Sequence, residues 1–136
     1  MTQRDTPALI ERYYVAFNRA DWPAMLDCLA DEVVHDLNEG GRETGRAAFA
    51  AFLARMDRCY TEELRDIVIL ASVDGRRAAA EYVVHGCYRT TDADLPAAHG
   101  QRYVLPGGAF FAVADGRITR VTNYYNLQEW LRQIRQ

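Results

Sequence analysis

The sequence predicts an α+β fold in which a curved antiparallel sheet wraps around N-terminal helices and leaves one open end. Two observations lead to this prediction. Up to Tyr60 most apolar side chains recur at helical spacing, whereas from Leu64 onward they fall in extended runs typical of strands. The dipeptides Asp74-Gly75 and Asp115-Gly116 suit tight hairpin turns between such strands. A length of 136 residues is enough for one hydrophobic core, so we expect a single domain over residues 1–136.

Three helices and one short strand are expected in the first half. The first helix starts at Thr6-Pro7, and the second follows Asp21. The β-branched stretch 33–38 predicts a strand that presents Asp36 near its end, and Thr44 is expected to cap a third helix. The apolar faces of the three helices carry, in order, Leu9, Ile10, Tyr13, Tyr14 and Phe17; Met25, Leu26 and Leu29; and Phe49, Phe52, Leu53, Met56 and Tyr60.

Four strands and a last helix are expected in the second half. The strands cover 64–73, 78–89, 103–113 and 118–125, and Pro106-Gly107-Gly108 predicts a bulge or bend in the third. Residues 90–100 form a loop that is long enough to cover a pocket. Asn126 and Glu129 form a capping box for the last helix. Because the helices would cover only one face of the sheet, we expect a homodimer through the other face.

Composition excludes several classes of function. The 16 basic and 19 acidic residues give a net charge of −3, and the arginines are spread along the chain, so we expect no nucleic-acid or membrane partner. No apolar run follows the first five residues, so no signal peptide is expected. Cys28, Cys59 and Cys87 lack metal-ligand spacing, which indicates buried thiols in a cytoplasmic protein and no metal site.

Asp36 is the leading candidate for a catalytic group. It follows Val33 and Val34 near a strand end, where rigid elements would hold its carboxylate. In an apolar pocket the pKa of such a carboxylate rises, and the group can act as a general base. A solvated carboxylate, or one that caps the next turn, is the commoner outcome for such a residue. His35 would point to the opposite face of the strand.

Aromatic and polar side chains supply the candidates for substrate binding. Of Tyr13 and Tyr14, we expect one in the core and one with its hydroxyl aimed into a cavity as an oxyanion donor. Glu81 and His85 share one face of a strand, either as substrate ligands or as a hydrogen-bonded structural pair. The other candidates for cavity walls are Trp22, Tyr103, Phe110, Asn123 and Tyr125.

Several stretches resemble a known superfamily. They are ERYYVAFN at 11–18, ADEVVHD at 30–36 and DGRI at 115–118, followed by YYN at 124–126, and they resemble the NTF2-like superfamily. Within it, His85-Gly86, Leu95-Pro96 and GQRY at 100–103 are similar to the branch of ketosteroid isomerase-related proteins and SnoaL-like polyketide cyclases. The resemblance implies a cystatin-like cone, a small hydrophobic ligand and no cofactor.

The same resemblance implies roles for individual residues. Asp36 falls where ketosteroid isomerase keeps its base, and Tyr13 falls where it keeps its oxyanion tyrosine. That enzyme completes its oxyanion hole with a protonated aspartate, whereas the matching position here holds Gly108, which has no side-chain donor. The missing polar group would then come from Glu81, His85 or Asn123.

We therefore expect acid/base chemistry on a small apolar carbonyl compound, by proton abstraction next to the carbonyl. Two alternatives stay open. One is water activation by Asp36 in a hydrolase or dehydratase of the same fold. The other is non-catalytic binding of a small hydrophobic ligand in the same pocket.

Overall fold

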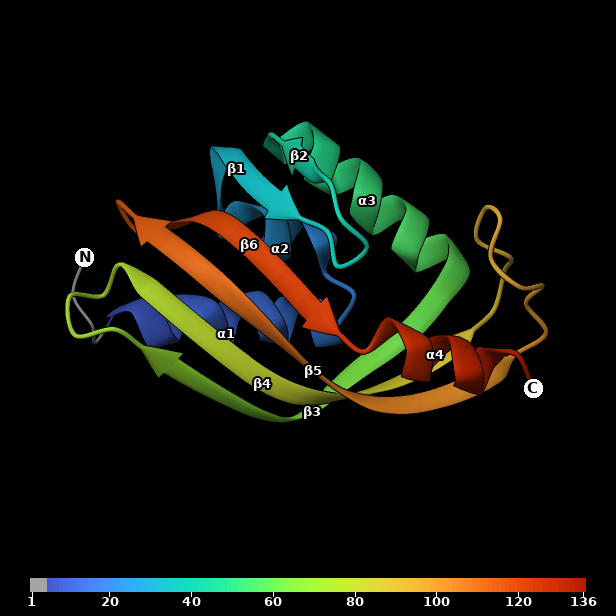
Figure 1. Cartoon of the computed structure of the whole chain (residues 1–136). Helices are drawn as coiled ribbons and strands as arrows, with labels where there is room; N and C mark the ends of the chain where they lie inside the picture. Colours follow the sequence, from blue (N-terminus) through green and yellow to red (C-terminus); the bar gives the residue numbers. More distant parts are fainter. Residues whose placement is uncertain (1–4) are drawn as a thin grey trace.

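The computed structural model describes residues 5–136, so residues 1–4, on which the signal-peptide prediction partly rests, lie outside the described residues. The described chain forms four helices and six strands (Figure 1). The helices are α1 (Asp5–Asn18), α2 (Trp22–Asp27), α3 (Arg46–Cys59) and α4 (Leu127–Ile134). The strands are β1 (Leu29–Asp36), β2 (Arg42–Thr44), β3 (Tyr60–Ala71), β4 (Arg77–Tyr88), β5 (Gln101–Ala114) and β6 (Arg117–Tyr125).

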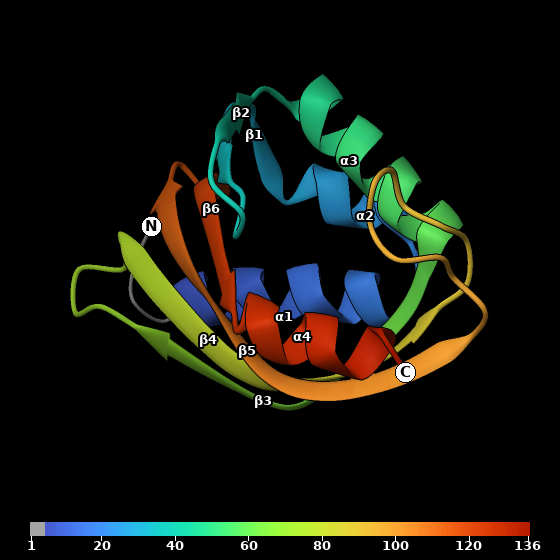
Figure 2. The same cartoon turned by 45° about the vertical axis from the view of Figure 1, so that its right-hand side comes forward.

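All six strands join one curved sheet in the order β2-β1-β6-β5-β4-β3. Strands β1 and β6 run parallel, and every other neighbouring pair is antiparallel. Helices α1 and α4 lie over the concave side of the sheet, and α3 lies across from them (Figure 2). The predicted α+β cone is therefore confirmed.

Several elements differ from their predicted bounds. Strand β1 covers Leu29–Asp36 and not 33–38, so Leu29 lies in β1 and not in the second helix. Thr44 ends the short strand β2, which was not predicted, and the residue that precedes α3 is Gly45, which makes no side-chain cap.

Strand β3 begins at Tyr60, directly after α3, and not at Leu64. Strand β5 is not interrupted at Pro106, which pairs with Val83 in an unbroken register, and the only shift against β6 falls between Ala112 and Val113. The chain therefore makes no bulge at Pro106-Gly107-Gly108.

Two glycines leave room for tyrosine rings on the concave face. A Cβ atom built on Gly86 would lie 2.2 Å from the ring of Tyr103, its neighbour on β5. A Cβ atom on Gly107 would lie 2.9 Å from the ring of Tyr82 on β4. The missing side chains therefore allow both rings to lie flat across the adjacent strand.

The convex face of the sheet carries no helix. It exposes several large apolar side chains, and homodimerisation through it remains a prediction; the exposed side chains include Val68, Val104, Phe110 and Tyr124. No helix within residues 5–136 is long and apolar enough to cross a membrane.

Candidate functional site

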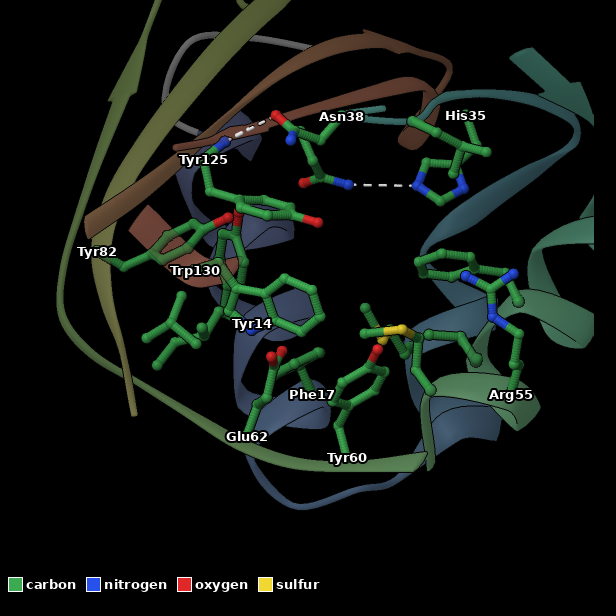
Figure 3. A pocket seen from close by; sticks show the side chains of 18 of the residues that line it. Tyr14, Phe17, His35, Asn38, Arg55, Tyr60, Glu62, Tyr82, Tyr125 and Trp130 are labelled. Carbon is green, nitrogen blue, oxygen red and sulfur yellow. Dashed lines mark hydrogen bonds between the residues drawn. The ribbon is translucent and has the colours of Figure 1, made fainter. Parts of the chain in front are cut away.

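A cavity of about 180 Å³ lies between the concave face of the sheet and the helices. Cavities of about 150 Å³ hold a single aromatic ring in other proteins, so this space suits a molecule of one or two rings. A large part of its wall is aromatic, with rings from Tyr13, Tyr14, Phe17, Phe49, Phe52, Tyr60, Tyr82, Tyr103, Tyr125 and Trp130. Polar side chains reach the cavity from strands, from α3 and from two loops, and several are labelled in Figure 3; they are His35, Asn38, Glu39, Arg55, Glu62, Asp92 and Asn123.

About half of the predicted site residues line this cavity. They are Tyr13, Tyr14, Tyr103, Asn123 and Tyr125. The others lie elsewhere, and the reason in most cases is the alternation of side chains along a strand.

Asp36 does not lie in the cavity. Its carboxylate is bound by Arg42, with Nε 2.6 Å from Oδ1, and by the Thr122 hydroxyl, 2.7 Å from Oδ2. The hydrogen bonds from Arg42 and Thr122 lower the pKa of Asp36 below its usual value. The prediction of a carboxylate in an apolar pocket with a raised pKa is therefore wrong, because β1 turns His35 inward and Asp36 outward.

The same alternation corrects the predicted face of β4 and β5. Glu81 and His85 point away from the cavity, which Tyr82 lines instead. Phe110 is 50% exposed on the convex face. Gly108 pairs with Glu81 on that outer face, so a side chain at this position would not reach the cavity either.

Trp22 begins α2 and packs edge-to-face against Phe17, with ring centroids 6.0 Å apart. It supports the wall from behind and is not one of the lining residues.

His35 is the titratable group that β1 does present to the cavity. Its side chain is buried, and its ring lies 4.6 Å from the ring centroids of both Phe49 and Phe52. The Asn123 side-chain nitrogen lies 3.2 Å from His35 Nε2, so an amide that donates there marks Nε2 as the acceptor. Burial lowers the pKa of His35, although Glu43 and Asp36 oppose that shift. The imidazole is therefore neutral at pH 7 and able to accept a proton.

Glu62 is a second titratable group in the cavity, and it was not predicted. It lies on β3, and the Tyr103 hydroxyl donates to its Oε2 at 2.5 Å. Burial raises the pKa of Glu62, and the hydrogen bond from Tyr103 only partly offsets this. A raised pKa favours the protonated carboxyl, which is a hydrogen-bond donor. The signal that could have identified it is the alternation of Tyr60, Glu62 and Leu64, which was hidden because Tyr60 also fits the helical spacing of α3.

Phenols supply further polar atoms around the cavity. The Tyr14 hydroxyl is buried and makes no hydrogen bond of good geometry to any residue in the range 5–136. The neighbouring Tyr82 has a pKa raised to about 12, chiefly by burial. Tyr125 donates to Glu39 at 3.1 Å, and its backbone N–H donates to Asn38. Such phenols stay protonated at neutral pH and act as donors.

The loop between β4 and β5, residues 89–100, is tied to the cavity wall. Asp92 is buried, accepts a hydrogen bond from the Tyr60 hydroxyl at 2.8 Å and lies 3.5 Å from Nε of Arg55. Asp92, Tyr60 and Arg55 all line the cavity, so this loop forms part of its wall. No group of three His, Cys, Asp or Glu side chains within the described part of the chain is arranged to hold a metal ion.

A curved six-stranded sheet that encloses helices and an aromatic cavity places the protein in the NTF2-like class of cone folds. More narrowly, the chain belongs to the SnoaL-like family, because the model of the SnoaL-like domain matches residues 10–121.

Solved structures agree with this assignment. A candidate polyketide cyclase from Xanthomonas campestris is 63% identical, with 98% of this chain and 99% of that chain covered and a TM-score of 0.95. Another candidate polyketide cyclase, from Pseudomonas putida, is 53% identical over 98% of both chains, with a TM-score of 0.95. A candidate ketosteroid isomerase from Kribbella flavida is 27% identical over 93% of this chain and 82% of that chain, with a TM-score of 0.65. No curated protein sequence matches the chain.

Proposed function

We propose that the protein is an acid/base enzyme that removes a proton next to the carbonyl of a small apolar compound. One observation carries this proposal. Two titratable groups with opposite pKa shifts, His35 from β1 and Glu62 from β3, lie on opposite sides of one aromatic cavity (Figure 3). Burial favours the neutral form of both groups, so the imidazole can accept a proton while the carboxyl can donate a hydrogen bond.

In this proposal His35 is the base. Its Nε2 accepts the proton from the carbon next to the substrate carbonyl, where the substrate C–H takes the place of the Asn123 amide. The C–H electron pair forms a carbon–carbon double bond, and the carbonyl π electrons move to oxygen. The proton rests on the imidazole until it is returned to carbon or oxygen in a later step.

Glu62 serves the oxygen of the same substrate. Its protonated carboxyl donates to the carbonyl oxygen and stabilises the enolate that forms there, while Tyr103 holds the other carboxyl oxygen. The Tyr14 hydroxyl, which lacks a well-formed hydrogen bond to the described residues, is a further donor for this oxygen. Together these groups replace the predicted pair of Asp36 and Tyr13.

The fate of the enolate defines the reaction class. Return of the proton to a different carbon gives an isomerase, and attack of the enolate carbon on a second carbonyl of the same molecule closes a ring. The relatives described as polyketide cyclases, at 50–63% identity, favour ring closure for this chain. The aromatic walls would hold the flat, partly cyclised substrate by stacking.

The proposal is tested by proton exchange at carbon in D₂O. The wild-type protein is mixed with β-tetralone or acetophenone, and NMR follows deuterium incorporation next to the carbonyl, which reports proton abstraction whatever the natural product is. The protein should accelerate exchange, and His35→Gln should reduce the acceleration by roughly 10²–10⁴-fold. Glu62→Gln should also slow exchange, because an amide stabilises the enolate less well than a carboxylic acid.

The matched control is His85→Gln, the same replacement on the outer face of the sheet, which should leave exchange unchanged. Thermal unfolding of each variant checks that it is folded. Binding of the aromatic alcohol β-naphthol is measured alongside. If the wild-type protein binds β-naphthol but does not accelerate deuterium exchange into either ketone, the proposal fails and the protein is a binding protein instead.

A further inference from the structure

One pair of buried polar atoms beside the cavity has no hydrogen-bond partner among residues 5–136. The atoms are Nδ1 of His35 and Oε1 of Glu43, and they lie 3.8 Å from each other. Buried polar groups are almost always hydrogen-bonded, so two such atoms that face one another require an explanation. A shortening of less than 1 Å would bring them into hydrogen-bond distance.

The backbone sets this approach. His35 and Glu43 are directly opposite in the antiparallel pair of β1 and β2, so their side chains lie on the same face of the sheet. His35 is held on its other sides by Phe49 and Phe52 of α3 and by Asn123 of β6. The Glu43 carboxylate therefore meets the edge of the imidazole that faces away from the cavity.

We propose that Glu43 is a positioning residue that accepts a hydrogen bond from Nδ1–H of His35 and so leaves the Nε2 lone pair for the substrate. This inference rests on the proposed function, in which His35 is the base. A carboxylate behind a histidine fixes the tautomer and ring orientation, and it stabilises the imidazolium that forms when Nε2 takes a proton. The proton stays on the imidazole and does not pass to Glu43.

Two carboxylates act on the charge of His35. One is Glu43 of β2. The other is Asp36 of β1, which points outward and is paired with Arg42. The groups that face it from α3 and β6 are the uncharged Phe49, Phe52 and Asn123. Both carboxylates raise the pKa of His35, with Glu43 the larger of the two, while burial lowers it.

The test is a nitrogen-15 NMR titration of the histidines, which needs no substrate. The chain has three histidines, so His35 is assigned by comparison with His35→Gln. In the wild-type protein the neutral ring should carry its hydrogen on Nδ1. Glu43→Gln, which keeps the shape and removes the charge, should lower the pKa of His35, and Glu43→Leu, which also removes the acceptor, should shift the hydrogen toward Nε2.

Glu32→Gln is the matched control, because it makes the same charge change at an exposed position of β1 and should leave the titration of His35 unchanged. In the ketone exchange assay Glu43→Gln should reduce the rate by roughly 10–100-fold, by analogy with the loss of the groups that orient metal-bound histidines. The lower inflection of its pH profile should move to lower pH.

A wild-type ring with its hydrogen on Nε2, or an unchanged pKa of His35 in Glu43→Gln, would overturn the inference. The two proposals can fail separately. If wild-type protein does not exchange ketones, the proposed function is wrong, whereas the NMR titration still decides whether Glu43 positions His35.

Discussion

Replacing Glu62 by glutamine should make the protein more stable at neutral pH, although it removes a group of the proposed site. The folded-state pKa of Glu62 is raised by burial above the usual value of 4.5. Below that value both the folded and the unfolded chains are protonated, and folding is not penalised. As pH rises through the folded-state pKa, the unfolded chain ionises first and stability is lost.

The magnitude follows from the linkage between pKa and folding. Each unit by which the pKa is raised costs about 1.4 kcal/mol of stability once the pH exceeds the folded-state pKa. Glutamine has no charged form and keeps an oxygen that accepts from Tyr103. We expect a gain that grows as pH rises above 4.5 and levels off once pH exceeds the folded-state pKa of Glu62, with roughly 3–5 °C in Tm for each kcal/mol.

The assay is thermal unfolding of wild type and Glu62→Gln between about pH 4 and pH 8. The difference in Tm should be small at the acidic end and grow with pH. Glu63→Gln is the control, because the next residue points outward, is exposed and pairs with Arg65. A variant that is less stable than wild type at the alkaline end, or a gain that does not depend on pH, would contradict a raised pKa of Glu62 in the folded protein.

Three further predictions concern stability and assembly. Asp36→Asn should lower the free energy of unfolding by less than about 1 kcal/mol near pH 7, as measured by urea unfolding. Because the pKa of Asp36 is lowered in the folded protein, this loss should vanish as pH falls through the folded-state pKa. A loss that persists in acid would contradict this prediction. Gly86→Ala should destabilise the protein by roughly 1–3 kcal/mol, since the added methyl group meets the ring of Tyr103 at 2.2 Å, and unchanged urea unfolding would argue against that contact. Wild-type protein should sediment as a dimer and Phe110→Arg as a monomer if the convex face is the interface, whereas a dimer that survives the substitution would place the interface elsewhere.

The fold was predictable because its signals are local. Helical spacing fixed the apolar faces of α1 and α3, and the two Asp-Gly turns fixed the hairpins β3–β4 and β5–β6. The helix-to-strand junction at Tyr60 was not predictable, because this residue satisfies the helical period of α3 and the two-residue period of β3 at once. That single ambiguity hid Glu62.

The site was less predictable because alternation says which side chains share a face but not which face is inside. In β1 the run Val33-Val34-His35-Asp36 places one valine on each face, so hydrophobicity does not distinguish them. In β4, Val83 and Val84 create the same ambiguity, which led to the wrong choice of Glu81 and His85.

Contacts between segments that are distant in the chain could not be predicted from the sequence, because they depend on how the strands pair. The approach of Glu43 to His35 depends on the register of β1 against β2. The approach of Tyr103 to Glu62 depends on the pairing of β3 with β4 and of β4 with β5, and on the absence of a side chain at Gly86.

In the proposed function His35, and not its neighbour Asp36, presents the proton acceptor to the cavity. The most direct test is ketone exchange in D₂O with His35→Gln and Asp36→Asn side by side. His35→Gln should lose roughly 10²–10⁴-fold of the exchange rate, while Asp36→Asn should stay close to wild type. Loss of exchange in Asp36→Asn, with activity retained in His35→Gln, would contradict this role of His35.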